Sequence, residues 1–429
     1  MTKITVNHLA RVEGDGGITV EMEGNQVKRV ELEVFEGPRL IEALAVGKTP
    51  EEVASFTPRI CAICSVSHKN AAVRGLERAG AYPEPEVTNL TRELMHMGEM
   101  VESHALHLFA LALPDFLGYP NVVAMVDKYA EVVTQALKLK KFGNKIMKLL
   151  NGKFIHGENA TPGGYGKYPS KAELLEVKAE AESFLPFMLQ AAGIVAGLEI
   201  PDYLESPTVF VCCKPEGDRF GFWGDELIVS DGTVIKAPDY KEHLVERVVP
   251  HSFAKRLLYK GKPFTVGSLA RLICIGDRLK GKAGELYRQL KNDRWAKNPF
   301  YNNLAQGIET IYSLERIPEL VDKLVTMTPP EQLTKPTRTE GRGVGFVEAP
   351  RGLLIHDYSY KDGYITDANI ITPTAMNLDD IERYIGLAAE KLSSEGKDAQ
   401  AMAFEFEKIA RAYDPCISCA THLVKVIER

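Results

Sequence analysis

Two Cys-x-x-Cys pairs near opposite ends of the sequence constrain the fold most. Cys61 and Cys64 form the first pair, and Cys416 and Cys419 form the second, in a chain of 429 residues. Cysteine thiolates at this spacing bind metal ions or carry out redox chemistry in a reducing compartment. If both pairs belong to one site, the first and last parts of the chain have to converge on it.

Composition narrows the class of protein. A chain of 429 residues that is 45% hydrophobic and 26% charged suits a large globular protein with an extensive core. The net charge of −6 gives no electrostatic case for a nucleic-acid partner or an anionic membrane. No apolar run reaches membrane-spanning length, so we expect no membrane insertion. The N-terminus lacks a signal sequence and the seven cysteines do not pair evenly, so we expect a cytoplasmic protein.

Apolar periodicity predicts an α+β fold that is mostly helical. Two alternating runs, Gly17–Glu23 and Val27–Phe35, predict a β-hairpin. Thr49 followed by Pro50 predicts a capped helix just before the first cysteine pair. Apolar residues at three- and four-residue spacing predict five long helices. They are expected at Val87–Leu113, Val122–Leu150, Lys171–Leu198, Phe264–Leu290 and Tyr301–Met327.

These elements suggest a long central helix bundle flanked by small mixed β regions. Residues 1–85 would form an N-terminal hairpin region with the first pair, and 86–336 the bundle, with non-helical inserts at 155–170 and 207–236. Residues 337–422 would form a C-terminal mixed α/β region of three short strands and two helices, near 378–392 and 399–413, with the second pair. Residues 423–429 would be a separate extension. Because no flexible linker is visible, we expect one packed body.

The cysteine spacing alone leaves three interpretations open. Four thiolates close a tetrahedral structural zinc site, which is the leading interpretation from spacing. A catalytic metal comes next, because a chain of this length does not need a zinc staple to fold. Two independent redox dithiols are the third, although neither pair lies in the βαβ context that such sites favour.

The residues around both cysteine pairs favour the catalytic metal over structural zinc. Phe56–Cys61 reads Phe-Thr-Pro-Arg-Ile-Cys, Ser65–His68 reads Ser-Val-Ser-His, and Asp414–His422 reads Asp-Pro-Cys-Ile-Ser-Cys-Ala-Thr-His. Together they resemble the signatures of the large, catalytic subunit of [NiFe] hydrogenases. The resemblance extends from Arg11 to His422, nearly the whole chain.

This resemblance implies a nickel–iron centre held by the four cysteines. Cys61 and Cys416 would be terminal nickel ligands, and Cys64 and Cys419 would bridge nickel to an iron that carries carbon monoxide and cyanide. Soft thiolate donors suit a nickel that changes redox state. Glu13, in Arg-Val-Glu-Gly, would relay protons away from Cys416.

The resemblance also implies a shell of residues around the metals. Arg351 would lie above them, with Asp115 as its ion-pair partner and Asp414 as an outer carboxylate. His68 would bond a bridging sulfur, Thr374 would bond a cyanide, and Pro350 would lie beside Arg351. Glu42 and His422 would hold a second ion, magnesium or iron. Without the resemblance, His104 and His107 would be read as buried core histidines.

Partners follow from the same resemblance and from what the chain lacks. The form of the first signature looks most like the soluble multisubunit group coupled to NAD(P)H. Gly341–Gly345 lacks the strand–turn–helix context of a nucleotide site. With no nucleotide or iron–sulfur motif in this chain, electrons are expected to pass to an iron–sulfur small subunit and then to NAD(P)-reductase subunits. A zinc-clamped docking protein is the rival from another class. The related quinone-reductase subunits of respiratory complex I lack the cysteines.

The last seven residues carry one more expectation. In the resembled family, an endopeptidase removes the residues after the final His once nickel is in place, here between His422 and Leu423. Because the sequence continues to Arg429, we expect an unprocessed precursor with an absent or incomplete nickel–iron centre. A maturation partner such as a nickel chaperone would bind this form.

Overall fold

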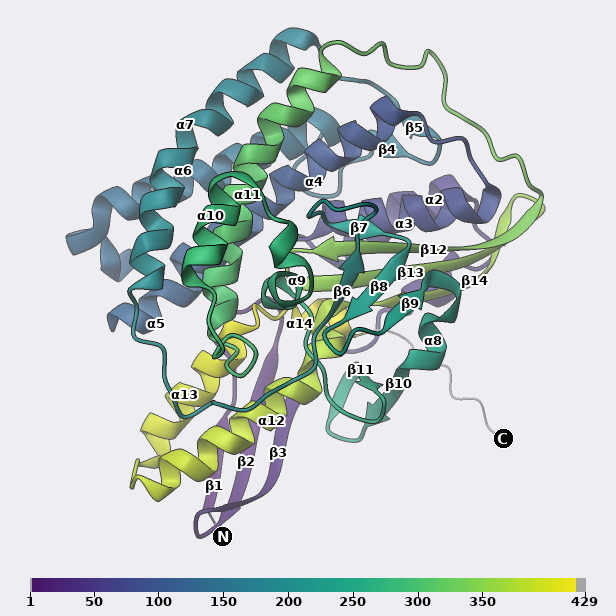
Figure 1. Cartoon of the computed structure of the whole chain (residues 1–429). Helices are drawn as coiled ribbons and strands as arrows, with labels where there is room; N and C mark the ends of the chain where they lie inside the picture. Colours follow the sequence, from purple (N-terminus) through teal and green to yellow (C-terminus); the bar gives the residue numbers. More distant parts are fainter. Residues whose placement is uncertain (1, 422–429) are drawn as a thin grey trace, which may run out of the picture.

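The first and last described segments of the protein pack against each other. The structure is a computed structural model that describes residues 2–421 (Figure 1). A three-stranded antiparallel sheet of β1 (Thr2–Val6), β2 (Gly16–Glu23) and β3 (Gln26–Val34) begins the chain. Helices α12 (Pro373–Ser394) and α13 (Ala399–Ala412) cover it. The predicted hairpin is confirmed, and β1 is an additional strand.

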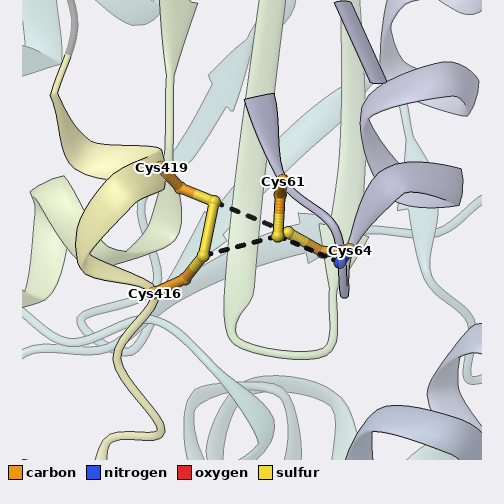
Figure 2. Close-up of side chains that lie close together, drawn as sticks. All are labelled: Cys61, Cys64, Cys416 and Cys419. Carbon is orange, nitrogen blue, oxygen red and sulfur yellow. Dashed lines mark hydrogen bonds between the residues drawn. A yellow bond between two sulfur atoms is a disulfide. The ribbon is translucent and has the colours of Figure 1, made fainter. Parts of the chain in front are cut away.

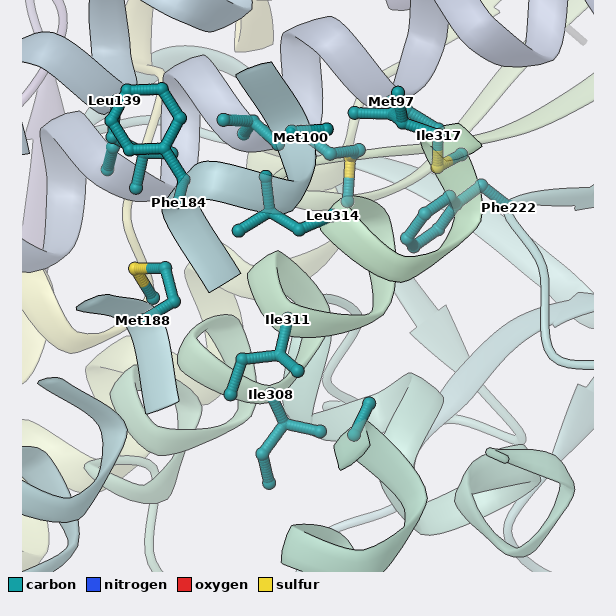
Figure 3. Packing of buried hydrophobic residues seen from close by; sticks show 14 of the residues in the cluster. Met97, Met100, Leu139, Phe184, Met188, Phe222, Ile308, Ile311, Leu314 and Ile317 are labelled. Carbon is teal, nitrogen blue, oxygen red and sulfur yellow. The ribbon is translucent and has the colours of Figure 1, made fainter. Parts of the chain in front are cut away.

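A helical bundle is formed by the middle part of the chain (Figure 1). It consists of α4 (Glu86–Leu106), α6 (Val126–Asn151), α7 (Lys171–Ala196) and α11 (Tyr301–Leu324). Figure 3 shows the apolar stripe of α11 meeting residues of α4, α6 and α7. The side chains labelled on these four helices are Met97, Met100, Leu139, Phe184, Met188, Ile308, Ile311, Leu314 and Ile317, and all belong to one buried cluster. The mostly helical α+β class is therefore confirmed. Among the described helices, none is apolar enough over a sufficient length to cross a bilayer.

Two of the predicted long helices differ from the structure. The helix expected from Val87 does not stop at Leu113: after α4 it widens into η2 (His107–Ala112), a π-helical segment, and continues as α5 (Leu113–Leu117). The single helix expected at Phe264–Leu290 was wrong. It is divided into α9 (Ser268–Ile275), η5 (Gly276–Arg278) and α10 (Gly281–Leu290). The Glu315 carboxylate accepts hydrogen bonds from the backbone N–H groups of Lys282 and Ala283, so it caps a new helix start.

A four-stranded antiparallel sheet lies beneath the helix that follows the first cysteine pair. Its strand order is β14 (Tyr364–Ile371), β13 (Gly352–Lys361), β12 (Glu340–Ala349) and β7 (Trp223–Gly224). Helix α3 (Ser65–Gly80) packs on β12 and β13. A Cβ atom at Gly341, Gly343 or Gly345 would lie 2.3, 2.1 and 2.1 Å, respectively, from a carbonyl oxygen of α3. This glycine run therefore lets the helix approach the strand closely, which accounts for it without a nucleotide.

The remaining elements are short. The chain reaches the first cysteine pair through α1 (Ile41–Ala45), α2 (Pro50–Phe56) and η1 (Thr57–Ile60), and the predicted capping box at Thr49 is present. Segment η3 (Val123–Met125) precedes α6. The inserts contain the pair β4 (Ala160–Thr161) and β5 (Gly164–Tyr165), and the sheet β6 (Val211–Lys214), β8 (Glu226–Val229) and β9 (Val234–Lys236). After η4 (Ala237–Asp239) and α8 (Tyr240–His243) comes a hairpin not predicted from sequence, β10 (Leu244–Val249) and β11 (Ser252–Tyr259).

Candidate metal centre

The four cysteines of the two pairs meet in the interior. Their sulfur atoms all lie within 4.8 Å of one another, and each residue is at most 5% exposed. Cys61 Sγ lies 3.5 Å from Cys416 Sγ, and Cys64 Sγ lies 3.7 Å from Cys419 Sγ (Figure 2). Cys416 and Cys419 are joined by a disulfide in this structure. A metal that takes all four sulfurs requires this pair in the reduced state.

Local backbone structure positions both pairs. Cys61 follows η1, and Cys64 is the N-cap of α3. Cys416 is the N-cap of the final helix, α14 (Ile417–Ala420). The segment before that helix runs beside the N-terminal loop: the Ile417 N–H donates to the Glu13 carbonyl at 2.8 Å, and a β-bridge joins Glu13 to Cys416. The convergence of the two chain ends, expected from the cysteine spacing, is thus confirmed.

The donor set fits a thiophilic metal centre. A hydrogen bond with Cys61 and burial both raise the pKa of the Cys64 thiol, whereas the charge of Arg351 lowers it. A metal ion that binds these sulfurs therefore has to displace protons. Four thiolates in a buried cluster are the ligands that soft metals such as nickel and zinc select.

Glu13 lies against the last cysteine pair. Cys416 Sγ lies 2.9 Å from Glu13 Oε2, so the thiol of the reduced residue would have this carboxylate as its neighbour. The Ser418 backbone N–H donates to the same oxygen at 3.3 Å, and the Ser418 hydroxyl donates to Oε1. Gly14 follows at φ 86°, and a Cβ there would lie 2.6 Å from Ser418 N, so only glycine allows this approach. The expected neighbour of Cys416 is therefore in place, held by a serine that the sequence did not single out.

Arg351 occupies a two-residue turn between β12 and β13. Its Nη2 lies 3.0 Å from Asp414 Oδ1, and its Nε donates to the same oxygen at 3.1 Å. Burial alone would lower the pKa of Arg351, but Asp414, Cys64 and Cys61 together raise it above the usual range. Arg351 Nη1 is buried and has no hydrogen-bond partner among residues 2–421. This free N–H lies beside four sulfurs, so a further bound group could accept a hydrogen bond from it.

Hydrogen bonds from Arg271 hold the backbone of this turn in place. Arg271 on α9 donates from Nη1 to the Ala349 carbonyl at 3.0 Å and from Nη2 to the Pro350 carbonyl at 3.3 Å. Glu309 on α11 accepts from Arg271 Nε at 2.5 Å and lies 3.0 Å from His104 Nε2. Pro350, expected near the centre, is thus part of the turn, and Arg271 is a supporting residue that no sequence motif indicated.

The expected pairing of Asp115 with Arg351 was wrong. Asp115 accepts from Arg411 Nε at 2.7 Å and from Arg411 Nη2 at 3.1 Å, and it also contacts Arg11. Asp414 takes the place expected for Asp115 because the loop after α13, rather than α5, reaches Arg351. Asp115 instead ties α5 to α13 and to the segment that precedes Glu13.

Other expected residues lie close to the cysteines in varied roles. Thr374 Oγ1 accepts from the Cys416 backbone N–H at 2.8 Å, so it supports the ligand loop. His68 Nδ1 lies 3.0 Å from His356 Nε2, and His356 Nδ1 lies 2.6 Å from the Tyr358 hydroxyl. His356 was visible in the sequence only as part of the Arg351 motif. Its contact with His68 depends on the packing of α3 on β13.

His107 in η2 is a satisfied core histidine, as composition suggested, whereas His104 on α4 is buried but its Nδ1 has no hydrogen-bond partner among residues 2–421. His107 Nδ1 lies 2.5 Å from Gln306 Oε1, and His107 Nε2 lies 2.8 Å from the Arg411 carbonyl. Gln306 Nε2 also donates to Asp414 Oδ2 at 3.1 Å. Gln306 therefore links η2 to the Arg351–Asp414 pair, a function that no local pattern in the sequence could reveal.

The expected second metal site is only partly described. Glu42 Oε1 lies 3.0 Å from the Lys255 ammonium, which also contacts Glu246, Asn369 Oδ1 and the Ile370 carbonyl at 3.0–3.2 Å. These oxygens suit a hard cation, and in this structure the cation is the lysine. His422, expected as the second ligand, and Leu423, expected after the cleavage point, lie outside the described residues.

Comparison with known proteins identifies the family. The family described as nickel-dependent hydrogenase matches residues 39–134 and 226–422. The chain belongs to this family, as a catalytic large subunit. Nickel therefore takes precedence over zinc for the four cysteines, and the zinc-clamp and redox-dithiol interpretations fall away.

Relatives cover this hydrogenase subunit from end to end. The alpha subunit of sulfhydrogenase 1 from Pyrococcus furiosus is 41% identical over 423 residues, which are 99% of this chain and 98% of the relative. The beta subunit of the NAD-reducing hydrogenase HoxS from Cupriavidus necator is 28% identical, with 98% and 94% covered. A crystal structure of an NAD+-reducing [NiFe]-hydrogenase in the H2-reduced state superposes with a TM-score of 0.87 at 29% identity, covering 98% of this chain and 100% of that one.

Proposed function

We propose that this hydrogenase subunit cleaves and forms H2 heterolytically, with the proton leaving through Cys416 and Glu13. The observation that carries the proposal is the 2.9 Å contact between Cys416 Sγ and Glu13 Oε2 at the edge of the four-sulfur cluster. When bound, the nickel–iron group supplies the electron-rich site at which H2 is polarised. Cys61 and Cys416 are the proposed terminal nickel ligands, and Cys64 and Cys419 the proposed bridges to an iron with carbon monoxide and cyanide.

The surrounding residues then have distinct tasks. The Glu13 carboxylate accepts the proton from Cys416 Sγ, while the Ser418 hydroxyl and N–H hold it in reach. Arg351 keeps a permanent positive charge beside the sulfurs, and Asp414 fixes its orientation. Its free Nη1 is available to a bound group. Burial of all four cysteines excludes bulk water from the reacting atoms.

The proposal retains the other roles expected from sequence. Thr374 would bond a cyanide, Pro350 would lie beside Arg351, and His68 would bond a bridging sulfur. Asp115 would act indirectly, since it anchors the segment that leads to Glu13. Glu42 and His422 would hold a magnesium or iron ion, beside the Lys255 ammonium that lies 3.0 Å from Glu42 Oε1.

Electrons are proposed to pass to an iron–sulfur small subunit and on to NAD(P). Two findings support this route: one relative is named an NAD-reducing hydrogenase, and the solved structure with the TM-score of 0.87 is of an NAD+-reducing enzyme. The relative at 41% identity is a sulfhydrogenase, so sulfur is a second candidate acceptor.

We further propose the maturation state and organisation. The chain would be a cytoplasmic precursor that a nickel chaperone loads and an endopeptidase trims after His422. The four parts 1–85, 86–336, 337–422 and 423–429 are the proposed organisation, with the last part removed on maturation.

Purification of the complete complex tests the function. We expect equimolar nickel and iron, infrared bands of iron-bound carbon monoxide and cyanide, and H2-dependent reduction of NAD+ or NADP+. A complex of the chain with Cys64→Ser should lose the bands and the activity together. Zinc alone in the parent complex would overturn the proposal, and dye reduction by H2 without NAD(P) reduction would overturn the acceptor.

A further inference from the structure

Two buried carboxylates on α4 have no part in the mechanism above. Glu99 and Glu102 lie one helical turn apart and are 0% and 4% exposed. Glu99 accepts hydrogen bonds from the backbone N–H groups of Val66 at 2.7 Å and Ser67 at 2.8 Å, and from the Ser67 hydroxyl. Glu102 Oε1 lies 2.9 Å from Lys140 Nζ.

The inner end of this pair meets the metal centre. Glu99 binds the N-terminus of α3, the helix whose N-cap is Cys64. The charge of Glu99 is near enough to raise the pKa of the Cys64 thiol, after the larger effects of Cys61 and burial. Glu102 in turn lies within electrostatic reach of Arg351 and Asp414. Both acids therefore lie within electrostatic reach of the centre, Glu99 at Cys64 and Glu102 at Arg351.

The outer end meets solvent. Lys140 is on α6, and its side chain is 31% exposed, so water reaches the atoms next to Glu102 Oε1. Among residues 2–421, three buried oxygens here have no hydrogen-bond partner: Ser65 Oγ, Glu102 Oε2 and Ser103 Oγ. Buried polar atoms without a protein partner normally bind internal water. Polar groups thus extend from the start of α3 to the surface of α6.

The acidity of the two carboxyls suits proton transfer. Burial raises the pKa of Glu99 to about 8, although its bonds from Ser67 and Val66 oppose the rise. Burial also raises the pKa of Glu102 above its usual value, against the effect of Lys140. A group that titrates near neutral pH accepts and releases a proton with little free-energy change.

We propose that Glu99 and Glu102 form a second proton route between the Cys61–Cys64 side of the centre and solvent beside Lys140. The protonated Glu99 carboxyl passes its proton to Glu102, which releases it to bulk solvent. The Glu99 carboxylate then takes up a proton from a sulfur through water, with no electron transferred along the way. The route rests on the proposed function and acts in parallel with Glu13. A purely structural role would make Glu99 only the cap of α3 and Glu102 only a salt-bridge partner.

Infrared difference spectra of the metal-free full-length chain test proton occupancy without activity. At neutral pH we expect the carbonyl band of a buried protonated carboxyl that moves in D2O. The band should disappear in Glu99→Gln and remain in Glu93→Gln, since Glu93 is a buried α4 acid paired with Arg316 at 2.8 Å. The absence of such a band, or a band that D2O leaves in place, would overturn the route.

Exchange of D2 with solvent protons in the mature complex tests the route itself, because this exchange requires proton transfer between the centre and solvent but no electron acceptor. In a Glu13→Gln background, adding Glu102→Gln should lower the remaining exchange about tenfold, and adding Glu93→Gln should not. If Glu102→Gln impairs nickel loading, Glu99→Gln should give the same loss. The second route would be overturned if Glu102→Gln left the residual D2 exchange of Glu13→Gln unchanged. It would also be overturned if Glu13→Gln alone showed no residual exchange. No exchange in the nickel-loaded parent would overturn the proposed function instead.

Discussion

Replacement of Glu13 by glutamine separates the proposed proton transfer from simple support of the loop. In the structure Glu13 Oε2 is 2.9 Å from Cys416 Sγ, and a glutamine amide of the same shape cannot take up that proton. A positioned general base contributes about 10²–10⁴-fold to a rate, or about 2.7–5.4 kcal/mol of barrier. We expect H2 oxidation to fall by about 10²-fold, near the lower limit, because the second route would remain.

The competing structural effect is smaller and can be measured separately. Glutamine keeps one acceptor oxygen for Ser418 but loses a charge-assisted hydrogen bond, which costs about 1.5–3 kcal/mol locally. Ser418→Ala is the matched control, because it removes the hydroxyl partner and leaves the acid. We expect a fall of less than about tenfold for Ser418→Ala, with nickel content and thermal midpoint recorded for both. Equal losses in the two variants, or normal exchange in Glu13→Gln, would refute the relay.

Three further changes probe the residues around the centre. Arg351→Lys keeps the charge but loses the second N–H toward Asp414, so we expect about tenfold lower H2 oxidation at unchanged nickel content; full activity would contradict the role. Asp115→Asn weakens a buried pair with Arg411, so the thermal midpoint should fall while the nickel-loaded fraction keeps its turnover; lost turnover in that fraction would make Asp115 catalytic. Glu99 has a folded pKa of about 8 against an ordinary 4.5, so the folded state holds the extra proton and stability should decline as pH rises through that window. Glu99→Gln should lose this decline, measured as thermal midpoint against pH; a decline that persists would contradict the raised pKa.

Local chemistry made part of this fold predictable. The hairpin of β2 and β3, the capping box at Thr49 and the long bundle helices depend on residues a few positions apart. The break between α9 and α10 was missed because Glu315, on another helix, supplies the cap that starts α10. The β10–β11 hairpin was also missed, and its buried Lys255 is held by partners from β14 and α1.

The site divides in the same way. The cysteines and Glu13 belong to contiguous motifs, so the order of residues alone was enough to locate them. The partner of Asp115 was assigned wrongly because ion pairs between distant segments depend on which loop reaches which turn. Gln306 and Arg271 were missed for the same reason. Nothing in the sequence around either residue indicates a contact with the site, and that contact arises only when α9 and α11 pack against the Arg351 turn.

The pairing of Glu13 with Cys416 and Ile417 also sets the order of events on the ribosome. The two residues of the Cys416–Glu13 contact are 403 positions apart, so the contact cannot form until almost the whole polypeptide has emerged. Cys61 and Cys64 are synthesised early, and Cys416 and Cys419 are not yet present for most of translation. A premature stop codon in the last few per cent of the reading frame would leave nearly all of the hydrophobic core intact and still delete half of the metal ligands.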